Sequence, residues 1–193
     1  DIAPSDMTGS WAGAFGQTQF MPSTFLELAV DFDGDGRRDL VNSVPDALAS
    51  TANFLDKRGY RTGEPWGYEV KLPSGFWGAS NRKDKKSISH WRNQGLTLAN
   101  GSPLPSTLGS AGLLLPAGTD GPAFLVGKNF DTFYSYNASE NYALAIAHLS
   151  DLIAREDSSK TDFVTTWPTD DPGISRQQSK DIQQALLNAG YDI

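Results

Sequence analysis

Residues 31–39 read Asp31-Phe32-Asp33-Gly34-Asp35-Gly36-Arg37-Arg38-Asp39 and place three carboxylates at alternating positions before a glycine. This spacing is typical of a loop that binds Ca²⁺ through oxygen atoms. Positions 1, 3 and 5 supply carboxylates, a glycine at position 6 allows a sharp turn, and a backbone carbonyl at position 7 adds a ligand. Without a cation, three carboxylates this close together would repel one another. We therefore expect a Ca²⁺ site formed by Asp31, Asp33, Asp35 and the carbonyl of Arg37, against the simpler alternative of a solvated acidic turn.

The end of this loop departs from the EF-hand pattern. Position 12 of an EF-hand loop carries a bidentate Glu, but Asn42 stands there, and the next carboxylate is Asp46. Ser43-Val44-Pro45-Asp46 is typical of a helix start, with an N-cap, an early proline and an acid in the first turn. We expect Asp46 to complete the coordination from the start of this helix, in a longer, EF-hand-like loop.

Composition limits the other possibilities. With 193 residues, 38% of them apolar, the chain can form one sizeable core, or one domain plus a fragment. A net charge of -7 argues against nucleic acid as a partner, and we expect the one basic cluster, residues 82–86, to be a solvated loop. The absence of cysteine excludes disulfides and thiolate chemistry, and no apolar run is long enough to span a membrane. The chain begins without a signal peptide, which favours a fragment or a processed product.

Hydrophobic periodicity predicts a mainly α protein with a small β element, an α+β fold class. An amphipathic helix is expected over residues 44–58, with Leu48, Thr51, Ala52 and Leu55 on its apolar face. The other expected elements are a helix at 23–29, a strand at 68–72, a helix at 87–94, two strands at 113–116 and 123–126, and the longest helix at 137–154.

The C-terminal third suggests a domain boundary. The helix expected at 137–154 carries an apolar stripe made of Tyr142, Ala145, Leu149, Leu152 and Ile153. Residues 157–173 are polar and contain prolines, as interdomain linkers do. A helix is expected from residue 174, and one amphipathic helix cannot bury its own apolar face. We therefore expect a domain at 1–156, a linker at 157–173, and the first helix of a truncated second domain at 174–193.

Three blocks stand in order along residues 5–155. The first is Gly9-Ser10-Trp11-Ala12-Gly13-Ala14-Phe15-Gly16-Gln17-Thr18-Gln19-Phe20-Met21-Pro22-Ser23. The second runs from Ala29 through the acidic loop into the helix that contains Phe54, and the third is Tyr136-Asn137 followed by Tyr142-Ala143-Leu144-Ala145. In order and spacing they resemble the membrane-bound lytic transglycosylase B family, the lytic murein transglycosylases. The helix after residue 173 resembles the first helix of a peptidoglycan-binding domain.

The resemblance implies a lysozyme-like helical lobe with an EF-hand-like Ca²⁺ loop, acting on peptidoglycan glycan strands in the periplasm or at the outer membrane of a bacterium. It implies cleavage of the β-1,4 bond between N-acetylmuramic acid and N-acetylglucosamine without water. A protonated Glu donates to the leaving oxygen, and the sugar's own C6 hydroxyl then attacks C1 to give a 1,6-anhydro product. The family's catalytic Glu lies in a Glu-Ser-x-aromatic-Gly segment before the first block, and these residues contain no such segment. We expect the acid upstream, on a missing N-terminal part of the same catalytic domain, and no turnover by this chain alone.

By the same resemblance, six residues are candidate substrate contacts: Ser10, Gln19, Phe54, Tyr136, Asn137 and Tyr142. Amide and hydroxyl groups beside aromatic rings suit a sugar chain. Structural roles remain open for three of them: Tyr142 in the core, Gln19 as a helix cap and Ser10 as a turn hydroxyl. Phe54 stands where relatives often carry Tyr, so we expect it to stack without a hydrogen bond. A second class of function also stays open, a non-catalytic, calcium-stabilised module that binds glycans.

Overall fold

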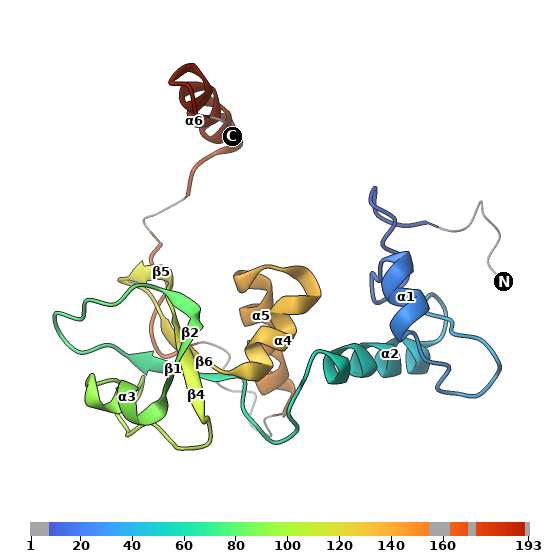
Figure 1. Ribbon diagram of the computed structural model, residues 1–193, viewed down its shortest axis with the longest axis horizontal. Helices are drawn as coiled ribbons and strands as arrows, with labels where there is room; N and C mark the ends of the chain where they lie inside the picture. Colours follow the sequence, from blue (N-terminus) through green and yellow to red (C-terminus); the bar gives the residue numbers. More distant parts are fainter. Residues whose placement is uncertain (1–7, 155–162, 170–172, 192–193) are drawn as a thin grey trace.

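A computed structural model describes residues 8–154, 163–169 and 173–191 of the chain. Its helices are α1 (Pro22–Leu28), α2 (Val44–Lys57), α3 (Ile88–Asn93), α4 (Lys128–Asn137), α5 (Glu140–Ala154) and α6 (Arg176–Asn188). Figure 1 shows α4 and α5 between a small sheet on one side and α2 and α1 on the other. α6 stands apart and buries none of its residues. Among the described residues, no helix is long and apolar enough to cross a membrane.

Five strands form one antiparallel sheet in the order β2-β4-β6-β1-β3. These strands are β1 (Gly67–Lys71), β2 (Asn81–Ser87), β3 (Thr97–Leu98), β4 (Ser110–Leu114) and β6 (Ala123–Val126), and a short β5 (Pro116–Thr119) follows β4. In the centre, Leu125 of β6 lies opposite Tyr68 on β1 and Leu113 on β4. The predicted small β element is therefore confirmed, with the expected strands at 68–72 and 123–126 observed as β1 and β6. The strand expected at 113–116 instead spans the end of β4 and the start of β5.

The central strand is covered on both faces. Side chains alternate along a strand, so Ala123 and Leu125 join the apolar cluster that includes Trp91 of α3. Phe124 and Val126 point the other way, into a cluster formed with α4 and α5. Burial on both faces explains why this strand is a continuous apolar run without polar alternation.

The basic cluster at residues 82–86 is not the solvated loop that its charge indicated. These residues lie within β2, and Arg82 is only 7% exposed. Its guanidinium forms ion pairs with Asp131 on α4 and Glu140 on α5. A buried charge needs such partners, and the two acids are distant in the sequence, so the charge run itself did not reveal them.

The helix expected at 137–154 is observed as α5, which starts three residues later than predicted, and α4 before it was not predicted. α4 ends at Asn137, Ala138 adopts a left-handed conformation with φ of 46°, and α5 begins at Glu140. The buried face of α5 consists of Ala143, Leu144 and Ala147. The predicted stripe was therefore wrong, because Ala145, Leu149 and Ile153 are exposed. The small Ala143 and Ala147 let α5 pack closely against its apolar cluster. Both this face of α5 and the adjacent one carry apolar residues, so the sequence pattern alone does not show which face is buried.

The face predicted for α2 was partly wrong: Leu55 packs against two apolar clusters, but Leu48 and Ala52 are exposed. Its buried residues are Asp46, Ala47, Ser50 and Phe54, whereas Leu48 is 67% exposed. The polar members are buried because they accept hydrogen bonds from backbone amides: the Ser50 hydroxyl from Val30 N at 2.8 Å and Asp46 from two loop residues. Phe54 contributes to a third apolar cluster, with Phe20, Leu28 and Leu40.

The middle of the expected linker lies against the sheet and α5. The ring of Phe163 is 4.9 Å from that of Phe124 and 4.2 Å from that of His148. The Glu69 carboxylate on β1 accepts the backbone N–H groups of Val164 at 2.8 Å and Thr165 at 2.7 Å. α6 confirms the helix expected after residue 174, whereas the division into domains remains a prediction.

Candidate functional site

The first of the three sequence blocks, residues 9–23, forms an irregular, glycine-rich wall. Two isolated antiparallel bridges, Gly9 with Phe15 and Phe15 with Phe20, fold it back on itself. Gly16 has φ of +69°, and a Cβ there would lie 2.5 Å from the carbonyl oxygen of Leu40. The next residue, Gln17, donates its backbone N–H to that same oxygen at 2.7 Å. Glycine is therefore required where the wall contacts the end of the acidic loop.

Gln19 and Ser10 are both exposed on this wall. Gln19 has φ of 51°, and its side-chain amide donates to the carbonyl of Gly16 at 2.8 Å. It does not cap α1, whose N-cap Met21 makes no side-chain bond. The Ser10 hydroxyl accepts the backbone N–H of Ala14 at 3.0 Å, so Ser10 does serve as a turn hydroxyl.

Two cavities border the wall, each of about 460 Å³. Ser10 lines a largely apolar one together with Phe15, Pro22 and Phe25. Gln19 lines the other, together with Gly16 and Gln17. A larger cavity of about 830 Å³ lies along the segment between β1 and β2, beside Phe76 and Trp77. We place the candidate glycan site at the wall, because the wall cavities contain the polar residues singled out by the sequence.

Tyr136, near the end of α4, joins the helix pair to the wall. Its hydroxyl donates to the carbonyl oxygen of Thr18 at 2.6 Å. Its ring lies 4.9 Å from that of Phe54, edge to face, and 6.0 Å from that of Phe20. Burial raises the pKa of Tyr136 above its ordinary value, so the phenol stays protonated as a donor.

The other residues of the third block lie around Tyr136. The half-buried Tyr142 of α5 stacks on Tyr136 with ring centroids 6.5 Å apart, and Asn137 is exposed at the end of α4. Phe54 is a correction: it is 5% exposed and packed within the third apolar cluster, so its ring cannot stack on a sugar. The structure thus brings Gln19, Tyr136 and Tyr142 to one region, through the bond between Tyr136 and Thr18.

Thr18 itself was missed by the sequence analysis. It is buried, and its hydroxyl has no hydrogen-bond partner in the described part of the chain. No local sequence signal distinguishes Thr18. Its backbone carbonyl accepts the hydrogen bond from Tyr136, which lies 118 residues later in the chain.

The acidic loop holds the three predicted carboxylates together. One oxygen each from Asp31, Asp33 and Asp35 lies within 4.8 Å of the other two. Asp31 accepts the backbone N–H groups of Gly34 at 2.7 Å and Gly36 at 2.9 Å. These bonds curl the loop around its carboxylates, and oxygen donors in this number suit a hard divalent cation.

Asp46, in the first turn of α2, bonds to the backbone of this loop. It is 1% exposed, and its two oxygens accept the backbone N–H groups of Phe32 and Asp39, each at 2.9 Å. These bonds lower the pKa of Asp46. Asp46 is not among the three carboxylates that cluster, so its place as a ligand, like that of the Arg37 carbonyl, remains a prediction.

Asp39 was not singled out from the sequence, yet it shapes the end of the loop. It accepts the backbone N–H of Asn42 at 2.8 Å and that of Val41 at 2.9 Å. The bond from Asn42 is the main cause of the lowered pKa of Asp39. An Asp followed by such a turn is a recognisable sequence signal.

No described glutamate is placed as a general acid. Glu64 is paired with Arg61, Glu140 with Arg82, and Glu69 accepts two backbone amides, while Glu27 is exposed. A general acid must reach the leaving oxygen of the substrate, and the carboxylates of Glu64, Glu69 and Glu140 are already bonded to groups of the protein. Glu156 lies outside the described residues.

Comparison with known proteins identifies the family. Residues 1–151 match the family model described as "Transglycosylase SLT domain". The chain belongs to this transglycosylase SLT domain family. The resemblance seen in the three sequence blocks is thereby confirmed.

Relatives of this SLT domain include enzymes of known structure. The chain is 37% identical over 156 residues to membrane-bound lytic murein transglycosylase B of Escherichia coli (strain K12), covering 78% of the chain and 41% of the relative. It is 48% identical to SltB3 from Pseudomonas aeruginosa in complex with NAG-NAM-pentapeptide, with a TM-score of 0.86 over 100% of this chain and 51% of that one. It is 36% identical to E. coli lytic transglycosylase Slt35 in complex with calcium, with a TM-score of 0.64 over 79% of this chain and 47% of that one. The chain therefore spans about half the length of these relatives or less, and the mainly helical fold with a small sheet matches theirs.

Proposed function

We propose that this SLT domain chain is part of a lytic murein transglycosylase. Its reaction cleaves the β-1,4 bond between N-acetylmuramic acid and N-acetylglucosamine in peptidoglycan and leaves a 1,6-anhydro product. One observation carries the proposal. This chain matches the structure of SltB3 bound to NAG-anhNAM-pentapeptide, with a TM-score of 0.85 and 47% identity over 99% of this chain. That ligand contains an anhydro sugar.

The chemistry needs one carboxyl group that acts first as acid and then as base. The partners of Glu64, Glu69 and Glu140 make these residues poor candidates. We propose that a Glu outside these 193 residues, on the N-terminal part of the same catalytic domain, supplies the proton. In this arrangement the chain described here contributes the wall and the helix pair that hold the sugar.

Four residues are assigned to the sugar in this proposal. The exposed Gln19 and Asn137 offer amides that can hydrogen-bond to hydroxyl and N-acetyl groups. Tyr142 offers a half-buried ring edge and a hydroxyl, and Ser10 extends the polar wall toward the apolar cavity. Tyr136 acts differently: its hydroxyl is used by Thr18, so it positions the wall against α4.

The acidic loop is proposed as a structural Ca²⁺ site. The clustered carboxylates of Asp31, Asp33 and Asp35 are the primary ligands, with the Arg37 carbonyl and Asp46 completing the coordination. The calcium complex of the related Slt35 supports this choice of ion. Bound Ca²⁺ would neutralise the repulsion between the carboxylates and stabilise the strip that joins α1 to α2.

A location in the periplasm or at the outer membrane follows from the proposed substrate. The E. coli relative is a membrane-bound lytic murein transglycosylase, which agrees with this location. The runner-up is a non-catalytic, calcium-stabilised module that binds glycans. The exposed wall would serve it equally well, so product chemistry must distinguish the two.

The test compares the 193-residue chain with the full-length protein on purified peptidoglycan. We expect the chain alone to sediment weakly with the polymer and release no soluble muropeptides, while the full-length protein releases them. Release by the chain alone would contradict the assignment of the acid to another segment. Binding without release by the full-length protein would favour the glycan-binding module instead.

A further inference from the structure

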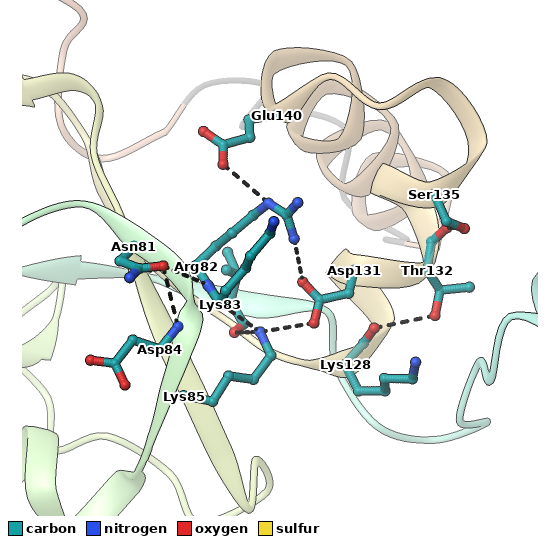
Figure 2. Close-up of polar contacts among 11 residues, drawn as sticks. Asn81, Arg82, Lys83, Asp84, Lys85, Lys128, Asp131, Thr132, Ser135 and Glu140 are labelled. Carbon is teal, nitrogen blue, oxygen red and sulfur yellow. Dashed lines mark hydrogen bonds and ion pairs between the residues drawn. The ribbon is translucent and has the colours of Figure 1, made fainter.

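Arg82 of β2 contacts both helices of the α4–α5 pair (Figure 2). Its Nη1 lies 3.0 Å from Oδ1 of Asp131 in the first turn of α4, and its Nε lies 3.1 Å from Oε1 of Glu140, the first residue of α5. The guanidinium carbon lies 3.5 Å from the centre of the Tyr134 ring, one turn further along α4. One side chain therefore holds two helices by three different contacts.

The surroundings fix Arg82 in place. Its side chain is 8% exposed. Lys85 binds the other oxygen of Asp131 at 3.0 Å and also donates to the carbonyl oxygens of Arg82 and Val126, at 2.9 and 3.1 Å. A Cβ on Gly112 of β4 would overlap the backbone of Arg82, so a glycine is needed for this close strand pairing. The guanidinium is thus presented from a rigid sheet, and its two donor edges suit two carboxylates.

The contacts of Arg82 lie on either side of the α4–α5 elbow, defined here as residues 137–139. At the elbow Ala138 adopts the left-handed conformation, which an alanine rarely does without external support. Tyr136 and Asn137 come immediately before Ala138, and Tyr142 lies in the first turn of α5. Because Tyr136 bonds α4 to the wall, a change in the angle between the helices would move Tyr142 relative to Asn137 and the wall.

We infer that Arg82 is a positioning residue for the proposed reaction. By holding Asp131 and Glu140 together it fixes the angle of the elbow, and with it the placement of Asn137 and Tyr142 against the wall. The kinetic consequence rests on the proposed function, whereas the control of elbow geometry does not. Misplacement of contacts by about 1 Å can reduce turnover about a hundredfold.

The decisive variant is Glu140→Gln in the full-length protein. Glu140 has a side chain that is 46% exposed, so its loss should shift Tm by less than about 3 °C. Its matched control is Glu27→Gln, which removes the same charge from an exposed position on α1. We expect kcat on peptidoglycan to fall about tenfold or more in Glu140→Gln, with KM within about twofold of the control. An unchanged kcat would overturn the inference.

The variant Arg82→Lys tests whether the geometry of the Arg82 guanidinium matters or only its positive charge. A lysine keeps the positive charge but is a single point donor without a planar fork, so it cannot replace both carboxylate bonds and the stacking on Tyr134. We therefore expect the same loss of kcat, while Lys83→Gln on the same strand behaves as wild type. Full activity in Arg82→Lys would show that charge alone suffices and would overturn the inference.

Hydrogen exchange gives a readout that does not depend on catalysis. The backbone N–H of Ala138 bonds to Tyr134 O at 2.7 Å, and that of Ala143 bonds to Ser139 O at 3.0 Å. Both amides should exchange about tenfold faster in Glu140→Gln than in Glu27→Gln. Unchanged exchange would overturn the inference. If the wild-type protein shows no transglycosylase activity, the proposed function fails, and exchange still decides whether Arg82 holds the elbow.

Discussion

The hydroxyl of Tyr136 donates a 2.6 Å hydrogen bond to the backbone carbonyl of Thr18, 118 residues earlier in the chain. It joins the glycine-rich wall to the helix pair that carries Asn137 and Tyr142. The ring beneath this hydroxyl packs against Phe20 and Phe54. Two of the three blocks that resemble the family signature therefore meet at one bond.

Tyr136→Phe tests this bond. The variant keeps the ring packing but leaves the Thr18 carbonyl without its donor, so we expect a loss of about 1 kcal/mol in the free energy of unfolding. Urea denaturation measures the change. The control is Tyr60→Phe, because Tyr60 is 38% exposed and its hydroxyl can bond to water. Equal stability of the two variants would show that the bond does not hold the wall.

Asp46 should make the protein sensitive to acid. Because the folded carboxyl has a lowered pKa, its contribution to stability is fully present above the pKa of the unfolded chain, about 3.9. The contribution is lost as the pH falls through that value toward the folded pKa. We expect Asp46→Asn to have a lower Tm than wild type at pH 7 in EDTA, and this difference to shrink below about pH 4. Asp56→Asn, at an exposed position on the same helix, is the control and should show no such convergence.

Calcium should stabilise the chain through the acidic loop. We expect added Ca²⁺ to raise Tm and EDTA to lower it, since an ion that binds only the folded state contributes about 2.7 kcal/mol at a hundred times its Kd. Asp33→Asn should remove most of this difference, whereas Asp56→Asn should leave it intact. Scanning calorimetry with and without the ion makes the measurement. A Tm that is the same with Ca²⁺ and with EDTA would contradict the proposed Ca²⁺ site.

Glu69 should hold the segment at residues 163–169 against the sheet. Replacing it by alanine removes the acceptor of two backbone amides, those of Val164 and Thr165. We expect these two amides to exchange about tenfold faster or more in Glu69→Ala, while those of β1 remain protected. Lys71→Ala, at an exposed position on the same strand, is the control. Unchanged exchange would mean that packing of Phe163 alone holds the segment.

The features that were predicted correctly depend on local spacing. The carboxylates at Asp31, Asp33 and Asp35 are two residues apart, so the turn itself brings them together. The capping signal at Ser43 likewise acts within three residues, and Ser43 does cap α2. The motif order along residues 5–155 identified the family for the same reason, since it needs no knowledge of the fold.

The features that were missed depend on partners far away in the chain. Arg82 bonds to acids that lie 49 and 58 residues later, and nothing in a run of basic residues shows which acids will face it. No proline or glycine marks the break between α4 and α5 at Ala138. Phe54 was expected at the sugar, but the surrounding Phe20 and Tyr136 bury it. Tertiary packing decides each of these outcomes, which local patterns do not record.

The chemistry of the product tests the central claim most directly. The full-length protein is incubated with purified peptidoglycan, and the soluble muropeptides are treated with borohydride and analysed by mass spectrometry. We predict 1,6-anhydromuramyl ends, which lack a reducing group, resist borohydride and are lighter by one water than hydrolysis products. Muropeptides with reducible ends, or no soluble products at all, would contradict a transglycosylase.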